Sequence, residues 1–336
     1  MNPIWVDDRG ALQGLGSSRT ADPGTGPDRY VVALDEIRRS GRDRAFASFT
    51  FDSDASGSII DIPETVQRGE VPTGPPPGPM TVIDDGVDEW RVGFEKAMLE
   101  IETGRVEKIV LARQVVLEVA DGEIEPVGIV SRLATTNPGC FVFSVGGLVG
   151  ASPELLVSLR RGRVSTLALA GTATDPEDLG SAKISEEHRH VSASVTRALG
   201  PHMTVVDLTE QVIVPHGNMS HVGTRIAGPA VPGTTVADIL ADLHPTAAVA
   251  GFPTSAALDL IREVEPESRG RYAGPVGWMD SDGDGVFAIA LRCGQIAGRR
   301  MTLYSGGGLV AGSEEGPELH ETKLKLAPML DALGQR

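Results

Sequence analysis

Cysteine and long hydrophobic segments are scarce in this sequence. Its 336 residues include only two cysteines, Cys140 and Cys293, which lie far apart and provide neither a disulfide framework nor a zinc site. No apolar stretch is long enough to cross a lipid bilayer. Residues 1–8 lack the cationic segment and apolar run of a signal peptide. We therefore expect a cytoplasmic protein with no membrane partner.

Positive charge is also limited. The sequence has 30 lysines and arginines against 46 aspartates and glutamates, which gives a net charge of −16. A chain this acidic is poorly suited to nucleic acid or to an anionic membrane surface. If its substrate is an anion, the protein must form a local positive site from a few buried lysines or arginines, a bound metal ion, or both.

The chain divides into two parts that differ in the clarity of their patterns. The first part is weakly patterned, with strands expected at Arg44–Phe51 and Ser58–Ile62. The proline-rich segment Val71–Pro79 is interpreted as an exposed connection. We therefore separate residues 1–80 from residues 81–336, although the length allows one large domain or two.

In the second part, strand and helix patterns follow one another. A long alternating strand covers Glu107–Val119, and a closing helix covers Pro317–Leu333. Further helices are expected at Ser185–Leu199, Thr235–Leu243 and Thr254–Val264. A three-stranded meander is expected from Gly274–Asp280, Val286–Cys293 and Gln295–Ser305. Adjacent strands interrupted by helices predict an α+β fold with large antiparallel sheets.

The closing helix carries the most informative spacing in the chain. Glu318, Glu321 and Lys325 are three and four residues apart, so their side chains project from one face of the helix. Two such carboxylates can hold a hard cation, and the lysine one turn further on can meet an anion bound to it. The alternative is a solvated acidic first turn, which glutamates favour in any helix.

Three other segments place a charged residue among apolar ones. Lys108 begins an apolar strand, where burial would lower its pKa as a general base requires; the alternative is a side chain that reaches solvent. Glu154 follows Pro153 at a strand entry, where burial would raise its pKa and let it donate a proton, unless the segment is a surface turn. Arg292 lies in an otherwise apolar strand, and a buried arginine needs an anionic partner.

Two further segments are similar to ligand-binding loops without matching them. Asp280–Gly285 imitates the start of a calcium loop, but Leu291 stands where an EF-hand needs glutamate, so we interpret the segment as a hairpin turn. Gly306–Gly308 lacks the lysine and hydroxyl residue of a phosphate loop, although its backbone N–H groups can approach an anion closely.

Taken in order, the motifs around these residues resemble those of the chorismate-utilising enzymes, the family of isochorismate, salicylate, anthranilate and aminodeoxychorismate synthases. The likeness covers residues 87–333 and is greatest to the isochorismate synthase branch. It implies an α+β fold (an α/β sandwich) in which two large, mainly antiparallel sheets pack together in a single domain flanked by helices. Residues 81–336 would then be the chorismate-binding catalytic region.

The resemblance also implies roles for individual residues. Lys108 resembles the general base that activates water, and Glu154 resembles the general acid that protonates the departing C4 hydroxyl. Glu187 and Glu321 resemble the ligands of Mg²⁺, with Glu318 in the outer shell. The residues that resemble the holders of substrate are Tyr272, Arg292, Lys325, His244, Gly171, Thr172, Gly306, Gly307 and Gly308.

A few positions distinguish the branches of this family. Ala170 stands where the aminodeoxychorismate branch has a lysine, which argues against an enzyme-bound amine nucleophile, and His244–Pro253 resembles the water-adding branch. We therefore expect Mg²⁺-dependent conversion of chorismate to isochorismate by a monomer without a glutaminase subunit. The alternatives are a salicylate synthase that eliminates pyruvate from isochorismate, a non-catalytic chorismate-binding paralogue, and an unrelated Mg²⁺ hydrolase. The later fate of the product, in menaquinone, siderophore or salicylate synthesis, is left open.

Overall fold

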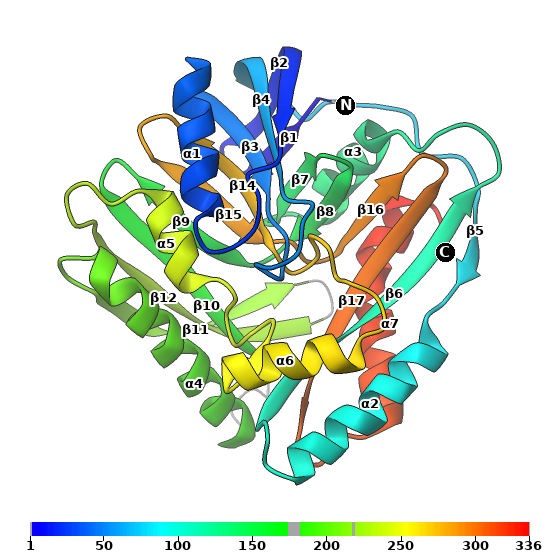
Figure 1. Ribbon diagram of the computed structural model, residues 1–336. Coiled ribbons are helices and arrows are strands. Elements are labelled where there is room, and N and C mark those ends of the chain that lie inside the picture. The colour runs from blue at the N-terminus through cyan, green and yellow to red at the C-terminus, as the bar shows by residue number, and fades with distance from the viewer. Residues whose placement is uncertain (1, 174–181, 217–218, 336) are drawn as a thin grey trace.

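The computed structural model describes residues 2–173, 182–216 and 219–335 (Figure 1), and within these ranges it leaves undescribed the side chains of residues 170–173, 182–190, 209–211, 214–216 and 219–221. The first twelve elements are β1 (Ile4–Asp7), β2 (Gly10–Ala21), α1 (Arg29–Ser40), β3 (Arg44–Ser48), β4 (Ile59–Gly69), β5 (Met80–Asp84), α2 (Val87–Glu102), β6 (Lys108–Val119), α3 (Pro126–Thr136), β7 (Phe141–Val145), β8 (Leu148–Ser152) and β9 (Leu155–Arg160). The others are β10 (Arg163–Ala173), α4 (Ala182–Leu199), the 3₁₀ turn η2 (Gly200–His202), β11 (Asp207–His216), β12 (Met219–Pro229), α5 (Val236–Leu243), β13 (Gly251–Phe252), α6 (Thr254–Val264), β14 (Pro275–Asp280), β15 (Gly285–Ile289), β16 (Cys293–Ala297), β17 (Arg300–Val310) and α7 (Glu315–Ala332).

The 17 strands of the described residues join into one continuous antiparallel sheet. One half runs β11–β12–β10–β9–β15–β14–β3. The other half runs β1–β7–β8–β16–β17–β6–β5. Strands β4 and β2 connect β3 to β1 at the top of Figure 1, between β9–β12 on the left and β16, β17 and β6 on the right. The predicted α+β domain with large antiparallel sheets is confirmed, and its two expected sheets are hydrogen-bonded to each other through the N-terminal strands.

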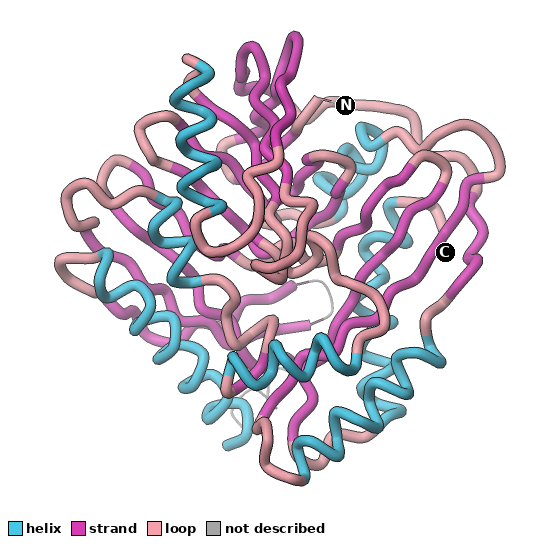
Figure 2. Tube along the Cα trace, in the orientation of Figure 1, coloured by secondary structure: helices cyan, strands magenta, loops and turns pink. Residues whose placement is uncertain are grey.

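Helices flank this sheet (Figure 2). α4 contacts β10, and α2 contacts β6. α3 contacts β7, α7 contacts β17, and these two helices also contact each other. α5 begins with a capping box in which the Thr235 side chain accepts from the Asp238 amide and the Asp238 carboxylate accepts from the Thr235 amide. Within the part of the chain that the structure describes, no helix is both long and apolar enough to span a membrane.

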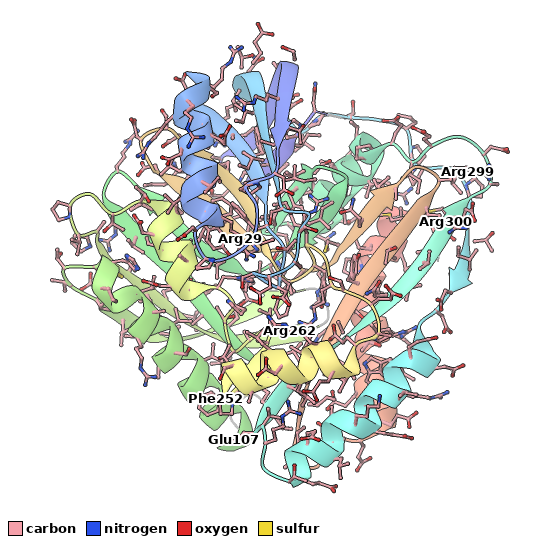
Figure 3. All side chains as sticks on the ribbon, viewed as in Figure 1. Arg29, Glu107, Phe252, Arg262, Arg299 and Arg300 are labelled. Atoms are coloured by element: carbon pink, nitrogen blue, oxygen red, sulfur yellow. The ribbon has the colours of Figure 1, made fainter. Side chains whose placement is uncertain are left out.

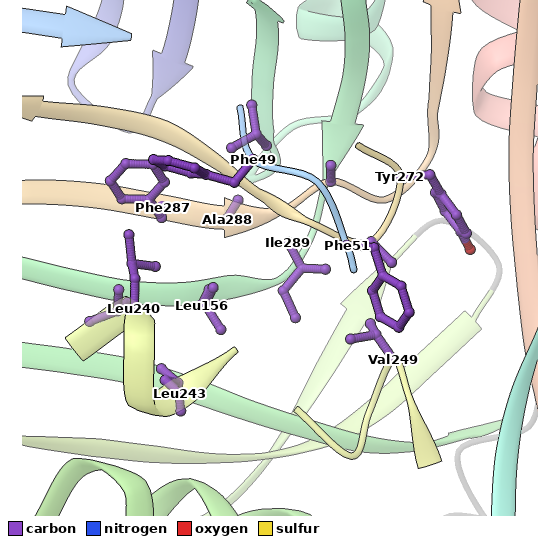
Figure 4. Packing of buried hydrophobic residues seen from close by; sticks show 14 of the residues in the cluster. Phe49, Phe51, Leu156, Leu240, Leu243, Val249, Tyr272, Phe287, Ala288 and Ile289 are labelled. Atoms are coloured by element: carbon purple, nitrogen blue, oxygen red, sulfur yellow. The ribbon is translucent and has the colours of Figure 1, made fainter. Parts of the chain in front are cut away.

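The main hydrophobic cluster takes residues from the whole chain. Trp5, Tyr30 and Phe46 from the N-terminal region are buried together with Phe143 and Phe287. Figure 4 shows part of this cluster, in which Phe287 lies among side chains from both halves of the sequence. The weakly patterned N-terminal region therefore shares its core with the rest of the protein. The boundary that we drew at residue 80 stays a prediction.

The predicted three-stranded meander is wrong. β14 pairs with β15 and β16 pairs with β17, but β15 is bonded to β9 whereas β16 is bonded to β8. The expected strand Val286–Cys293 is interrupted at Arg292, whose backbone is left-handed with a φ of 47°. The chain therefore passes from one half of the sheet to the other at this arginine. The Asp280–Gly285 segment forms the turn between β14 and β15, as predicted.

Candidate active site

Lys108 is the first residue of β6, where three strands meet. Its register partners are Phe252 in β13 and Val310 in β17, and the Glu107 amide donates to the Phe252 carbonyl at 2.8 Å (Figure 3). The Lys108 side chain is half-buried and lies beside Gly308. A Cβ added to Gly308 would lie 2.9 Å from Lys108 Cε and 3.5 Å from Nζ, so the glycine leaves the space that the lysine occupies.

The same glycine segment borders two other predicted site residues. A Cβ added to Gly306 would lie 2.9 Å from the Tyr272 hydroxyl, and one added to Gly307 would lie 3.4 Å from Glu318 Oε2. Lys325 Nζ donates to the Gly306 carbonyl oxygen at 2.8 Å. The backbone of this segment therefore brings helix α7, the tyrosine and the start of β6 into one place.

On α7, the expected spacing produces an ion pair. Lys325 Nζ lies 2.5 Å from Glu321 Oε1, and the Ser313 hydroxyl donates to Glu318 Oε1 at 2.7 Å. Burial lowers the pKa of Lys325, although the Glu321 carboxylate opposes this effect. Both glutamates therefore present oxygen atoms on the face of α7 that contacts the glycine segment of β17.

Glu154 lies in the two-residue connection between β8 and β9. Its amide donates to the Ser152 hydroxyl at 3.2 Å, and its carbonyl accepts from the Ile289 amide at 3.1 Å, so its backbone is held from both sides. Although the side chain keeps some contact with solvent, desolvation raises the pKa of its carboxyl to about 7. The nearby charges of Lys108, Arg292 and Lys325 lower the pKa and limit this rise. Glu154 can therefore be protonated near neutral pH, as a general acid must be.

Arg292 is the least compensated charge in this cluster. Its residue is only 6% exposed, and its Nη1 atom has no hydrogen-bond partner among the described residues. Burial lowers the pKa of the guanidinium, while Tyr272, Glu321 and Glu154 raise it. A buried nitrogen without a partner is costly, so the site is suited to an anion that completes its hydrogen bonding.

Tyr272 is held in place by contacts that the sequence did not reveal. Its ring stacks on Tyr304 of β17, with ring centroids 5.1 Å apart and planes 7° apart. Burial raises the pKa of the Tyr272 hydroxyl well above its ordinary value, so it serves as a neutral hydrogen-bond donor. Three residues earlier, the buried Arg269 donates to the Val110 carbonyl in β6 at 2.6 Å and pairs with Glu265.

Comparison with known proteins identifies the family. A sequence profile described as "Chorismate binding enzyme" matches residues 66–334. The chain belongs to the chorismate-binding enzyme family. It is 34% identical over 264 residues to the isochorismate synthase MenF of Bacillus subtilis, and 33% identical over 325 residues to the salicylate biosynthesis isochorismate synthase of Pseudomonas aeruginosa. The crystal structure of DhbC from Bacillus anthracis shares the fold, with a TM-score of 0.88 and 27% identity over 99% of this chain and 96% of that chain.

These matches differ in how much of each protein they cover. The alignment with the B. subtilis protein spans 74% of this chain but only 56% of the relative, and that with the P. aeruginosa protein spans 91% and 66%, respectively. The chain thus covers less than two thirds of the length of the curated relatives. Family membership and fold are established by these matches.

The remaining family-derived site residues are Gly171, Thr172, Glu187 and His244. Gly171 and Thr172 in β10 and Glu187 in α4 lie where side chains are outside the described part of the structure. His244 has both ring nitrogens inside the protein, with Nδ1 3.4 Å from the Tyr30 hydroxyl and Nε2 3.1 Å from the Ala273 carbonyl oxygen.

Burial lowers the pKa of His244 to about 3, so its ring is neutral. Because Ala273 directly follows Tyr272, the histidine supports the turn that carries the tyrosine. Its predicted contact with substrate stays a prediction.

Of the predicted metal ligands, the structure describes the side chains of Glu318 and Glu321 on α7 but not that of Glu187. The residues with described side chains contain no group of three or more histidine, cysteine, aspartate or glutamate residues able to hold a metal ion. Glu321 and Glu318 supply carboxylate oxygens, which are the ligands that Mg²⁺ prefers. The donor chemistry of α7 therefore fits a hard divalent cation, with Glu187 as the remaining candidate ligand.

Proposed function

We propose that this chain is an isochorismate synthase that converts chorismate to isochorismate with Mg²⁺. The observation that carries the proposal is the unpartnered Nη1 atom of buried Arg292, whose guanidinium is within electrostatic reach of Glu321 and Glu154. An acidic protein that keeps a guanidinium with an unpartnered nitrogen in its interior is suited to binding an anion there. Chorismate carries two carboxylates, and the curated relatives named above are isochorismate synthases.

Lys108 and Glu154 divide the proton transfers of this reaction. Lys108 accepts a proton from water, whose oxygen bonds to C2 of the substrate ring. The ring double bonds shift, and the bond between C4 and its hydroxyl oxygen breaks. Protonated Glu154 gives its proton to that oxygen, so that one water enters and one leaves. The two residues come from β6 and from the β8–β9 connection, so the fold offers a base and an acid from separate strands.

Arg292, Lys325 and Tyr272 are the candidates for holding the substrate carboxylates. Arg292 offers a free donor nitrogen, and the neutral Tyr272 hydroxyl lies beside Gly306. Lys325 already contacts the Gly306 carbonyl, so its ammonium lies at the same segment of β17. The absence of side chains at Gly306–Gly308 lets Tyr272, Glu318 and Lys108 approach this backbone closely.

Glu187 and Glu321 are the residues that would hold Mg²⁺, with Glu318 supporting them. When bound, the ion would supply positive charge to stabilise negative charge that develops on the substrate during C4–O cleavage. The ion pair between Glu321 and Lys325 orients this carboxylate on α7. We infer no dependence on a glutaminase subunit, because Ala170 replaces the lysine of the aminodeoxychorismate branch and the proposed reaction uses water.

The direct test is to incubate the purified chain with chorismate and Mg²⁺ near pH 7.5 and to separate the products by chromatography. We expect isochorismate in a reversible equilibrium with chorismate. Lactate dehydrogenase and NADH, added to a parallel reaction, should detect no pyruvate. Stoichiometric pyruvate with salicylate fluorescence would instead identify a salicylate synthase. Chorismate binding without any turnover, with or without Mg²⁺, would identify a non-catalytic paralogue.

A further inference from the structure

An arginine-rich pocket lies on the half of the sheet that contains β9, β10, β14 and β3. Its volume is about 620 Å³, within the range of small-molecule sites. The arginines that line it are Arg9, Arg44, Arg68, Arg160, Arg161 and Arg163. The carboxylates that line it are Asp280 and Asp284. In a chain with a net charge of −16, this concentration of guanidinium groups is the opposite of the general surface charge.

The arginines converge from four places in the sequence because the sheet aligns them. Arg160 and Arg163 are register partners across the β9–β10 hairpin, and Arg44 is the register partner of Asp280 across β3 and β14. Arg68 comes from the end of β4 and Arg9 from the turn before β2, which the β2–β4 pairing brings to the same edge. The cluster is therefore a product of the fold and not of a basic run in the sequence.

Contacts beneath the pocket hold several of these guanidiniums in place. The Asp7 side chain is 2% exposed and accepts from Arg68 Nη1 at 3.1 Å and from Arg160 Nη2 at 3.2 Å. The guanidinium carbons of Arg44 and Arg160 lie 4.1 Å and 5.0 Å from the centre of the Trp278 ring. Arginines ordered in this way lose little further side-chain entropy when an anion binds.

The arginines are also incompletely neutralised by the protein itself. Arg44 Nε is buried without a hydrogen-bond partner among the described residues, and Arg44 lies 3.8 Å from Asp280. Desolvation lowers the pKa of Arg44 and of Arg160, and the nearby charge of Arg68 lowers both further. At the rim, Arg163 is 59% exposed and lies 3.9 Å from the exposed Asp207. The pocket lining thus retains a net positive charge.

The pocket is separate from the candidate active site. Arg160 ends β9, and Glu154 immediately precedes that strand. The six residues of β9 span about 20 Å at roughly 3.3 Å per residue. None of the residues lining the pocket belongs to the Lys108–Glu154–Arg292 cluster.

We propose that this pocket is a second binding site, for a small polyanion that carries two or more phosphate or carboxylate groups. Each guanidinium can bind one such group through two parallel hydrogen bonds, and several guanidiniums together can bind two or more groups of the same molecule, which a single surface arginine cannot do. The ring of Trp278 is already covered by arginines, so recognition would come from charge and hydrogen bonding and not from stacking on the ligand.

Isothermal titration calorimetry with inorganic pyrophosphate and, separately, with citrate tests this proposal. Both titrations use buffer from which divalent metal has been removed with an immobilised chelating resin, because each probe chelates Mg²⁺ and a soluble chelator such as EDTA is itself a polycarboxylate that would compete for the pocket. We expect saturable binding of at least one probe, and the stronger one distinguishes a phosphate site from a carboxylate site. Binding should weaken when NaCl is raised from about 50 to about 200 mM, because salt screens the arginines. No saturable binding of either probe would overturn the proposal.

Variants locate the binding. Arg160→Gln should weaken it about tenfold or more, the usual effect of losing a charge-assisted hydrogen bond. Because Arg160 also pairs with buried Asp7, Arg163→Gln provides a second variant at an exposed position, where folding is not at stake. The matched control is Arg300→Gln at the start of β17, an exposed arginine on the other side of the molecule (Figure 3).

The active-site variant Arg292→Gln should bind the probe as the wild type does. The proposal is overturned if Arg160→Gln and Arg163→Gln both bind like the wild type, or if Arg292→Gln abolishes binding. The second result would place the probe in the chorismate site. Chorismate turnover by Arg163→Gln should stay at the wild-type rate, since this residue lies outside the catalytic cluster.

Discussion

Replacing Glu154 by glutamine should make the folded protein more stable in alkaline solution while it removes most of the activity. The carboxyl has a pKa of about 7 in the folded protein against an ordinary value of 4.5. Because the folded pKa is raised, the folded state binds the proton more tightly than the unfolded state does. The free energy of unfolding of the wild type therefore falls as the pH rises from about 4.5 to about 7, and stays lower above that.

The size of this effect follows from the two pKa values. At 1.36 kcal/mol for each pKa unit, the ionised carboxylate lowers the free energy of unfolding by about 3 kcal/mol in total. Of this, about 2 kcal/mol is lost between pH 5.5 and pH 8.5. Glutamine has nearly the same shape and cannot ionise, so the Glu154→Gln variant escapes the loss. For a chain of this size, 1 kcal/mol corresponds to roughly 2 °C in melting temperature. The melting temperature of the variant minus that of the wild type should therefore be about 4 °C larger at pH 8.5 than at pH 5.5.

Thermal unfolding of both proteins at pH 5.5 and pH 8.5, in EDTA and without chorismate, measures the effect. These pH values avoid the isoelectric point near 4.9, where a protein of this composition precipitates most easily. The matched control is Glu89→Gln, which removes an exposed carboxylate in the first turn of α2 and should change stability by less than about 0.5 kcal/mol at either pH. If the gap between Glu154→Gln and the wild type is the same at both pH values, the carboxyl is not desolvated as we describe.

The same pKa predicts the pH dependence of catalysis. A general acid is active when protonated, so the kcat of the wild type should decline as the pH rises through about 7. The Glu154→Gln variant should be slower by about two to four orders of magnitude and should lack this decline. A variant with a wild-type rate would remove Glu154 from its proposed role even if the stability result held.

The remaining predictions concern four other residues. Lys108→Ala should lower kcat by about two to four orders of magnitude, measured by chromatography of the products, with an unchanged circular dichroism spectrum; a near wild-type rate would exclude it as the base. Arg292→Gln should raise KM for chorismate by about tenfold or more, because a charged donor to the substrate is lost; an unchanged KM would place the carboxylate elsewhere. Glu321→Gln should weaken Mg²⁺ binding about tenfold or more and recover part of its activity in excess Mg²⁺, whereas full activity in EDTA would contradict a metal role. Gly150→Ala should lower both the melting temperature and chorismate affinity, because a Cβ there would lie 2.4 Å from Cys293 Cβ and 2.8 Å from the Arg292 carbonyl oxygen; normal values for both would show that these strands can separate at little cost.

The parts of this structure that the sequence predicted are those specified by local pattern. β6 and α7 lie within two residues of their predicted bounds, because alternation and helical periodicity are written in adjacent residues. The spacing of Glu318, Glu321 and Lys325 predicted that they share one face of a helix, and the ion pair between Glu321 and Lys325 agrees with this. Resemblance to the family supplied what periodicity cannot, the grouping of Lys108 and Glu154 from distant segments.

The parts that the sequence did not predict depend on contacts between distant segments. An arginine with positive φ has no local signature, because residues with a Cβ rarely adopt that conformation, and so the strand was predicted to continue through Arg292. The pairing of β15 with β9 and of β16 with β8 is set by tertiary packing. The bond from Arg269 to the Val110 carbonyl likewise joins segments far apart in sequence, where nothing in the composition marks them as neighbours.

The break at Arg292 explains why the proposed acid and the substrate-binding guanidinium are held together. On one side of the break, the Ile289 amide at the end of β15 donates to the Glu154 carbonyl at 3.1 Å. On the other side, the Arg292 carbonyl accepts from the Ala151 amide of β8, also at 3.1 Å. The chain that carries Arg292 is thus bonded to Glu154 three residues before the arginine, and to β8 at the carbonyl of the arginine itself. Neither group can move away from the other without breaking backbone hydrogen bonds, so the strained φ of Arg292 is maintained by the same contacts that fix the position of Glu154.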